Sequence, residues 1–199
     1  IAQRREIFGQ RRQVMVSVPA AALGGLLGGW LLLRTDASIF EKLVPWLILL
    51  ATLLLAFESH IKAAVVRLSG HGASTPRNEL ASDIALAGLV FTGALYGGFF
   101  GAGLGIVVLA LMGLVMSETL TRINAVKQTV SLTSNCAAAF LFYGSGLVDW
   151  PAAIALGLGA FAGGECGGLF ASKVDPRLLR IVVVLLGIAI SVAFFIKHY

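Results

Sequence analysis

A glycine-rich stretch in the middle of the chain, residues 96–105, reads YGGFFGAGLG and holds five glycines in ten residues. Glycine disfavours a continuous helix, and a bend here would leave the first backbone N–H groups of the next helix without intrahelical acceptors. In lipid such groups need a partner from protein, water or a ligand, and helix N-termini bind anions. We therefore interpret five glycines as lining a binding site for a small anion: Gly97, Gly98, Gly101, Gly103 and Gly105. The alternative is that they only allow close helix packing.

Two ionisable residues, Lys127 and Glu165, lie within otherwise apolar segments. Ionisable groups inside a membrane are costly and usually face a cavity, a partner or an ion path. The stretch from Lys127 to Tyr143 is nearly as long as the stretch from Trp150 to Glu165, so antiparallel neighbouring helices would hold the two charges at similar depth, where they could pair. We expect Lys127 to supply positive charge to the anion, and Glu165 to balance that charge or to carry a coupled proton. The alternative for Lys127 is that its side chain extends to the cytoplasmic interface.

A polar stripe follows the helix that carries Lys127. Its members Asn124, Gln128, Ser131 and Asn135 are spaced by four, three and four residues, so they share one helical face. We predict that this face lines the anion site beside the bend, although hydrogen bonding between helices would also explain polar residues here. The three histidines are scattered and no nucleophile set is visible. We therefore expect no catalytic residues, no metal and no cofactor.

The elements that must position these residues are membrane helices. Of the 199 residues, 58% are hydrophobic and 13% are charged, which is too little charged surface for a water-soluble protein of this size. The uncharged runs far exceed the roughly 10 residues of a barrel strand and do not alternate, so the predicted class is an all-α integral membrane protein. The net charge of +5 lies in the loops and reports orientation rather than a nucleic-acid partner.

One uncharged run, 84–117, is too long for a single crossing. Its 34 residues would form a helix of about 51 Å, whereas the hydrocarbon core is about 30 Å thick. The segments on both sides of it, 58–83 and 122–127, carry positive residues and are predicted to be cytoplasmic. The run must therefore enter and leave on the same side, which predicts a helical hairpin of two short helices folded at the glycines.

The sequence also contains an internal repeat. The motif Gly24-Gly25-Leu-Leu-Gly28-Gly29 recurs in the second half of the chain as Gly163-Gly164-Glu-Cys-Gly167-Gly168, and close helix packing is a sufficient explanation for these glycines. Four arginines precede the first copy, whereas the segment before the second copy, 144–149, has no positive residue. Corresponding loops thus lie on opposite sides, which is typical of inverted-topology repeats. We expect each repeat to hold a glycine-rich hairpin and three transmembrane helices, with the front of the first repeat belonging upstream of Ile1.

These patterns divide the chain into three parts. The first is the C-terminal part of the first repeat with two transmembrane helices, the second is a cytoplasmic linker, and the third is a complete second repeat with a hairpin and three helices. The predicted bounds are 1–58 for the partial repeat, 59–82 for the linker, 83–199 for the complete repeat, 84–117 for its hairpin, and 121–143, 150–172 and 177–197 for its helices.

The motif YGGFFGAGLG, followed by Arg122-Ile-Asn124-Ala-Val-Lys127 and by Val148-Asp149-Trp150, resembles the sulfite exporter TauE/SafE family of membrane permeases. The resemblance implies transport of a small sulfur-containing anion such as sulfite, thiosulfate or a sulfonate across a bacterial plasma (inner) membrane, and no enzymatic activity. We expect alternating access, with the anion, the lipid bilayer and a second copy in a homodimer as partners, and no nucleic acid. The alternative is a non-transporting scaffold subunit of a larger membrane complex.

Overall fold

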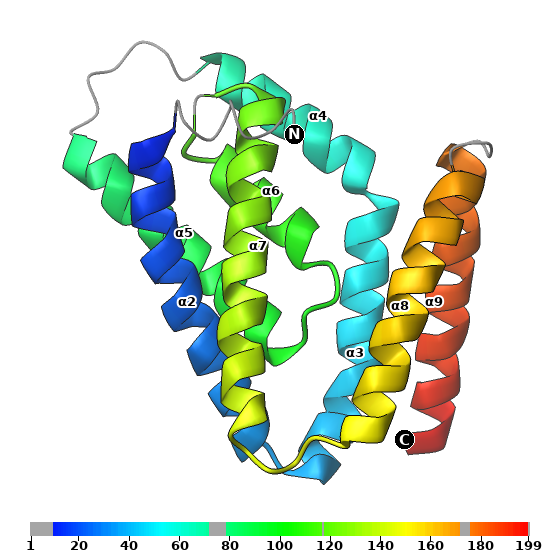
Figure 1. The fold of residues 1–199 in the computed structure, drawn as a ribbon. Coiled ribbons are helices and arrows are strands. Elements are labelled where there is room, and N and C mark those ends of the chain that lie inside the picture. The colour runs from blue at the N-terminus through cyan, green and yellow to red at the C-terminus, as the bar shows by residue number, and fades with distance from the viewer. Residues whose placement is uncertain (1–9, 72–78, 117, 172–175, 199) are drawn as a thin grey trace.

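The computed structural model describes residues 10–71, 79–116, 118–171 and 176–198, and the regular elements in these ranges are all α-helices (Figure 1). This confirms the predicted fold class. In chain order the helices are α2 (Arg11–Arg34), α3 (Ala37–Ala56), α4 (Glu58–His71), α5 (Glu79–Phe99), α6 (Leu104–Gly113), α7 (Leu120–Tyr143), α8 (Trp150–Ala171) and α9 (Pro176–His198).

Three of these helices are long and apolar enough to cross a membrane, namely α2, α3 and the Leu80–Phe99 part of α5. The apolar parts of α6, α8 and α9 are shorter, at Leu104–Gly113, Trp150–Gly164 and Arg180–Ile196. Within the described ranges α7 is as long as α2 but falls outside this group, because its polar residues lower its hydropathy. The chain is therefore a helical membrane protein, as its composition predicts.

The chain turns back at the glycines of the long apolar run, where α5 ends at Phe99 and α6 begins at Leu104. Gly101 and Gly103 have φ angles of 80° and 74°, a left-handed conformation that residues with a Cβ rarely adopt. The Tyr96 hydroxyl donates a 2.7 Å hydrogen bond across the bend to the Ala102 carbonyl. Figure 1 shows that α5 begins and α6 ends toward the same end of the molecule, as the hairpin prediction requires.

Helix α2 packs between α5 and α7 through its glycines. A Cβ on Gly24 would lie 2.5 Å from the Phe91 carbonyl oxygen of α5, and one on Gly25 would lie 2.5 Å from the Ser134 carbonyl oxygen of α7. A Cβ on Gly28 would overlap the Leu95 carbonyl oxygen. Only residues without a side chain let these backbones approach so closely, so the predicted packing role of the first motif is confirmed. Behind this contact lies a core of buried side chains that includes Val90, Val108, Met112, Ile123, Val126 and Val130.

Helices α3 and α9 form a second packed pair. The Ser191 hydroxyl of α9 donates a 2.9 Å hydrogen bond to the Pro45 carbonyl of α3. Gly187 lies directly against Thr52, whose side chain occupies the space that a Cβ at 187 would need. Small residues therefore hold this pair together as well.

The helix bounds follow the internal repeat, because the offset that separates α8 from α2 at their first residues (11 to 150) also separates α9 from α3 (37 to 176). Figure 1 shows the related helices running in opposite directions, with α2 descending and α8 ascending in that view. The division into two inverted repeats remains a prediction.

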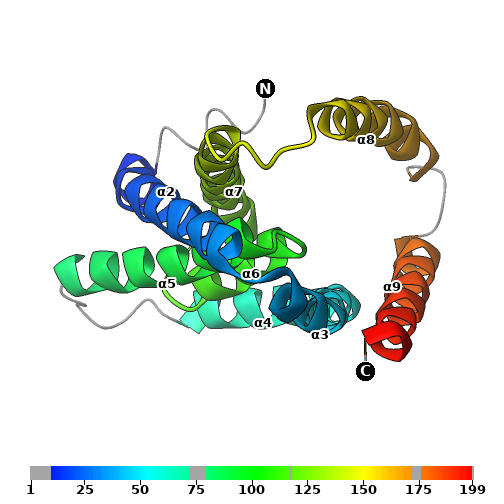
Figure 2. The same ribbon diagram turned by 90° about the horizontal axis from the view of Figure 1, so that it is seen from below.

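Helix α8 differs from its counterpart because it stands apart from α2, α5 and α7 (Figure 2). All residues from 150 to 164 are exposed. A Cβ on Gly163, Gly164 or Gly167 would meet nothing within 4 Å. The predicted close packing of the second glycine motif is therefore not observed at these three positions, because no backbone of the described chain faces them. The surroundings of Gly168 lie outside the described residues.

Candidate functional site

The bend between α5 and α6 exposes backbone donors at the start of α6. The Leu104 amide donates to the Gly101 carbonyl at 3.3 Å, and the Ile106 amide donates to the Gly103 carbonyl at 2.9 Å. Among the described residues, the amides of Ala102, Gly103 and Gly105 have no such acceptor. The N-terminus of a helix carries partial positive charge, so these free donors favour a negatively charged ligand.

Lys127 lies beside this bend. Its Nζ is 3.7 Å from the position that a Cβ on Gly105 would occupy. It is half-buried, and it sits seven positions past the first residue of α7, or about 10 Å into the helix. No hydrogen-bond acceptor or carboxylate of the described chain pairs with it. The structure thus brings together two of the predicted site residues, an amino group and a glycine backbone.

The five glycines of the bend serve three different purposes. Gly97 and Gly98 are packing residues, since a Cβ at 97 would lie 2.7 Å from the Leu104 side chain and one at 98 would overlap the Gly25 carbonyl oxygen of α2. Gly101 and Gly103 make the turn. Gly105 faces Lys127, so it is the glycine whose backbone is best placed to meet an ion.

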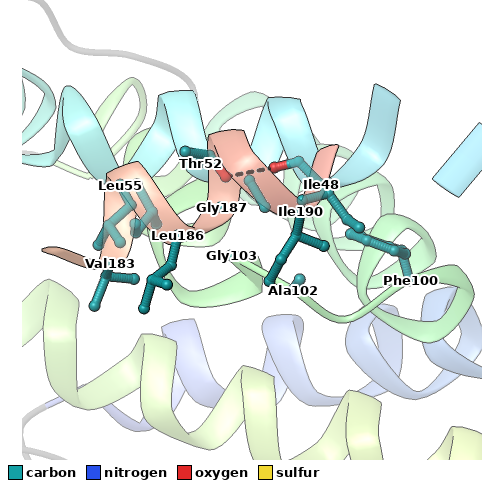
Figure 3. A pocket seen from close by; sticks show the side chains of 12 residues that line it. Ile48, Thr52, Leu55, Phe100, Ala102, Gly103, Val183, Leu186, Gly187 and Ile190 are labelled. Carbon is teal, nitrogen blue, oxygen red and sulfur yellow. Dashed lines mark hydrogen bonds between the residues drawn. The ribbon is translucent and has the colours of Figure 1, made fainter. Parts of the chain in front are cut away.

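The side of the bend that faces α3 and α9 borders a cavity of about 360 Å³ (Figure 3). Figure 3 shows aliphatic side chains such as Ile48, Leu186 and Ile190 around it, and the Thr52 hydroxyl is already bonded to the Ile48 carbonyl at 2.7 Å. The residues that line it carry no charge. An anion is therefore better accommodated on the Lys127 side of the bend.

The four residues of the predicted polar stripe on α7 differ in their exposure. Asn124 is half-buried and lines a second, polar cavity, whereas Gln128 and Asn135 are exposed. The Ser131 hydroxyl is buried, and no residue in the described part of the chain forms a hydrogen bond with it. Ser134, beside the stripe, donates a 3.1 Å hydrogen bond to the Ala94 carbonyl of α5. This residue therefore forms a hydrogen bond between helices, which was the alternative explanation for polar residues on α7. Asn124 is thus the stripe residue that lines a cavity with polar groups, and Lys127, three residues further along α7, is not part of that lining.

Glu165 lies on α8, but its side chain is outside the described part of the structure. The antiparallel packing of α7 and α8 that would pair it with Lys127 is not observed, because α8 leaves α7 after the 144–149 connection (Figure 2). The roles of Glu165 in charge balance or proton coupling remain predictions.

The sequence did not predict two residues that line the same cavity as Asn124. They are Lys62 on α4 and Thr121 on α7. The segment from 59 to 82 looked like a plain linker, but its first half forms α4. Val65 of this helix is buried and packs directly on Gly113 of α6. The spacing of Ile61 and Val65, one helical turn apart, is the signal that could have revealed a packed helix.

Known proteins resemble this chain along most of its length. The family model described as Sulfite exporter TauE/SafE matches residues 1–194. A probable membrane transporter protein of Haemophilus influenzae is 27% identical over 166 residues, which make up 82% of this chain and 60% of that protein. A probable membrane transporter protein of Sinorhizobium, ORF9, is 25% identical over 197 residues, which make up 95% of this chain and 68% of that protein.

No solved structure gave a significant match. The chain spans 60% and 68% of the lengths of these two relatives. The family match covers nearly every residue, including the bend and Lys127, and it confirms the resemblance seen in the sequence motifs. The chain belongs to the sulfite exporter TauE/SafE family.

Proposed function

We propose that the chain is part of a secondary permease that moves a small sulfur-containing anion, such as sulfite, thiosulfate or a sulfonate, across a bacterial plasma membrane by alternating access. Family membership supports transport and the class of anion. The observation that carries the proposal is the half-buried Lys127 beside the Gly105 bend, without a carboxylate partner among the described residues. Such a group is costly in a membrane, and a bound anion would offset the cost.

The bound anion would accept hydrogen bonds from the Gly105 amide and from the Lys127 ammonium. Both donors lie in a partly desolvated place, where charge-assisted hydrogen bonds are stronger than in water. Glycine at position 105 leaves room for an oxyanion to reach the backbone. Glu165 would neutralise Lys127 when the anion leaves, or carry a proton that moves with it.

The bend is the element whose motion would expose the anion to one side and then the other. Helix α6 is short, with 10 residues, and the apolar cavity in Figure 3 leaves space between the bend and helices α3 and α9. Gly101 and Gly103 can change their backbone angles more freely than residues with side chains. We therefore assign the conformational change to a shift of the bend toward that cavity.

Uptake of radiolabelled sulfite, thiosulfate and methanesulfonate into proteoliposomes that contain the purified chain tests the proposal. Saturable flux of at least one anion is expected, and no saturable flux for any of them would overturn it.

The role of Lys127 is tested in the same vesicles. Lys127→Ala should raise the half-saturation concentration about tenfold or more, because it removes a charged hydrogen-bond donor. Lys127→Arg should keep part of the affinity. Lys42→Ala, an exposed lysine near the start of α3, is the matched control and should leave the value unchanged. An unchanged value for Lys127→Ala would make Lys127 an interface anchor.

A second candidate is a non-transporting scaffold subunit of a larger membrane complex. The uncovered glycine face of α8 favours it, because such faces pack on other helices in membranes. Purification from native membranes distinguishes the two. A stoichiometric partner, including a second copy of the chain, together with no intrinsic anion flux would support the scaffold.

A further inference from the structure

A second cavity, of about 290 Å³, lies where α4, α6 and α7 meet. Its lining contains three side chains that can donate a hydrogen bond, namely Lys62 of α4 and Thr121 and Asn124 of α7. The other two lining residues, Leu109 and Leu120, are apolar, and none of the five lining residues carries a carboxylate. An ammonium, a hydroxyl and an amide that converge on one cavity suit a small oxyanion.

Two of the donors that line the cavity, Thr121 and Asn124, lie on the same helix as Lys127. Asn124 is three residues from Thr121 on one side and three from Lys127 on the other, so it is a neighbour of each on the helix surface. The step from Asn124 to Lys127 corresponds to a rise of about 4.5 Å. The charges of Lys62 and of its partner Glu58 both act on Lys127, with opposite signs. An anion that leaves the cavity past Asn124 would therefore come within one helical turn of Lys127.

Lys62 is neutralised in this structure by Glu58, one turn earlier on α4. The Glu58 Oε1 atom lies 2.5 Å from Lys62 Nζ, and its Oε2 atom accepts a 3.3 Å hydrogen bond from Arg180 of α9. Glu58 thus holds a separate cation with each oxygen. An anion that enters the cavity can take the place of Glu58 on Lys62, while Glu58 keeps Arg180 as its partner. This exchange leaves neither Lys62 nor Glu58 without an opposite charge.

We propose that the Lys62 cavity is a second binding site for a small oxyanion, on the cytoplasmic side of the Lys127 site, and that Glu58 competes with the anion for Lys62. The inference rests on the proposed function for the class of ligand, and on the loop charges for the cytoplasmic orientation. Lys62 and Asn124 bind the incoming ion, and Glu58 returns to Lys62 when the ion moves on to Lys127.

Equilibrium binding and flux test the proposal separately, with ³⁵S-thiosulfate as the probe. In proteoliposomes of known orientation, Lys62→Ala should raise the half-saturation concentration about tenfold for thiosulfate supplied at the cytoplasmic face. The value at the opposite face should not change. Lys62→Arg should restore most of the affinity because it keeps the charge. Arg67→Ala is the matched control, since it removes one positive charge from an exposed position on the same helix. Glu58→Gln should lower the cytoplasmic half-saturation concentration severalfold by removing the competitor.

The same variants in detergent give equilibrium affinities that do not depend on transport. Weaker thiosulfate binding by Lys62→Ala than by Arg67→Ala would support the cavity even if the wild type showed no flux, a result that would overturn only the proposed function. If Lys62→Ala transported thiosulfate with the same half-saturation concentration as the wild type at each face, that result would overturn the proposed cavity site and leave the proposed function standing. An equal increase at both faces would also overturn it, because it would indicate a general structural defect. A wild-type chain that binds no thiosulfate would overturn the cavity proposal, whereas the proposed function would fall only if none of the three anions showed saturable flux.

Discussion

Helices α2 and α8 carry the same spacing of paired glycines at corresponding positions of the internal repeat, yet the structure uses the two motifs differently. In α2 the motif brings three backbones together, because Gly24 and Gly28 meet α5 and Gly25 meets α7. In α8 the glycines at 163, 164 and 167 face open space. The motif therefore permits a close approach but does not by itself produce one.

The reason lies in the facing surfaces. Helix α5 presents Gly98 to Gly25 of α2, so the contact is between two positions that both lack side chains. Helix α7 adds Ser134, whose hydroxyl bonds α5 beneath the same contact. Packing in a membrane depends on such complementary small surfaces rather than on hydrophobicity, since lipid is as apolar as the helix. No described helix offers α8 a matching surface.

The largest difference in stability between the two helices is expected when the same side chain is placed in both motifs. Gly28→Val in α2 should destabilise the fold by about 3 kcal/mol or more, because its Cβ would overlap the Leu95 carbonyl and backbone cannot yield cheaply. Gly167→Val, at the related position of α8, should change stability by less than about 0.5 kcal/mol. Thermal unfolding of the purified chain in detergent measures both. Comparable losses in the two variants would show that α8 is packed after all.

A smaller effect is expected where α7 supports the α2 contact. Ser134→Ala should cost about 1 kcal/mol, because a buried hydroxyl that bonds the Ala94 carbonyl is removed. Ser131→Ala, one turn earlier on the same helix, removes a buried hydroxyl that has no partner among the described residues, so it should be neutral or slightly stabilising. The same unfolding assay compares them. A larger loss for Ser131→Ala than for Ser134→Ala would mean that Ser131 binds a group outside the described chain.

Much of this architecture could be predicted because it follows from length and charge. The uncharged run 84–117 was too long for one crossing, and both of its flanks carried positive charge, so a bend at the glycines was the remaining solution. The helix bounds of α8 and α9 likewise follow from the repeat.

The purpose of each glycine could not be predicted, because all glycines look alike in a sequence. Gly98 faces the α2 backbone, Gly105 faces Lys127, and Gly103 makes the turn with a left-handed φ, and these differences arise only in the folded chain. For the same reason the role of Lys62 could not be predicted, since Lys62 lines a cavity that exists only where three helices meet. The separation of α7 from α8 is also a tertiary property, which equal depth along two helices does not determine, so the charge-balancing role of Glu165 stays a prediction.

The smallest effect concerns an ion pair that joins α2 to α5 and has no equivalent in α8. Arg12 lies 2.8 Å from Asp83, and the position related to Arg12 by the repeat is Pro151, which cannot form an ion pair. Both charges are partly exposed, so Arg12→Ala should cost less than about 1 kcal/mol, and added salt should reduce the difference from wild type. Unfolding at low and high ionic strength measures this. If Arg12→Ala lowered the free energy of unfolding as much as Gly28→Val, then charge rather than the glycines would hold α2 in place. The contrast between α2 and α8 would then be explained by Pro151, which cannot form the ion pair, and not by the lack of a facing backbone.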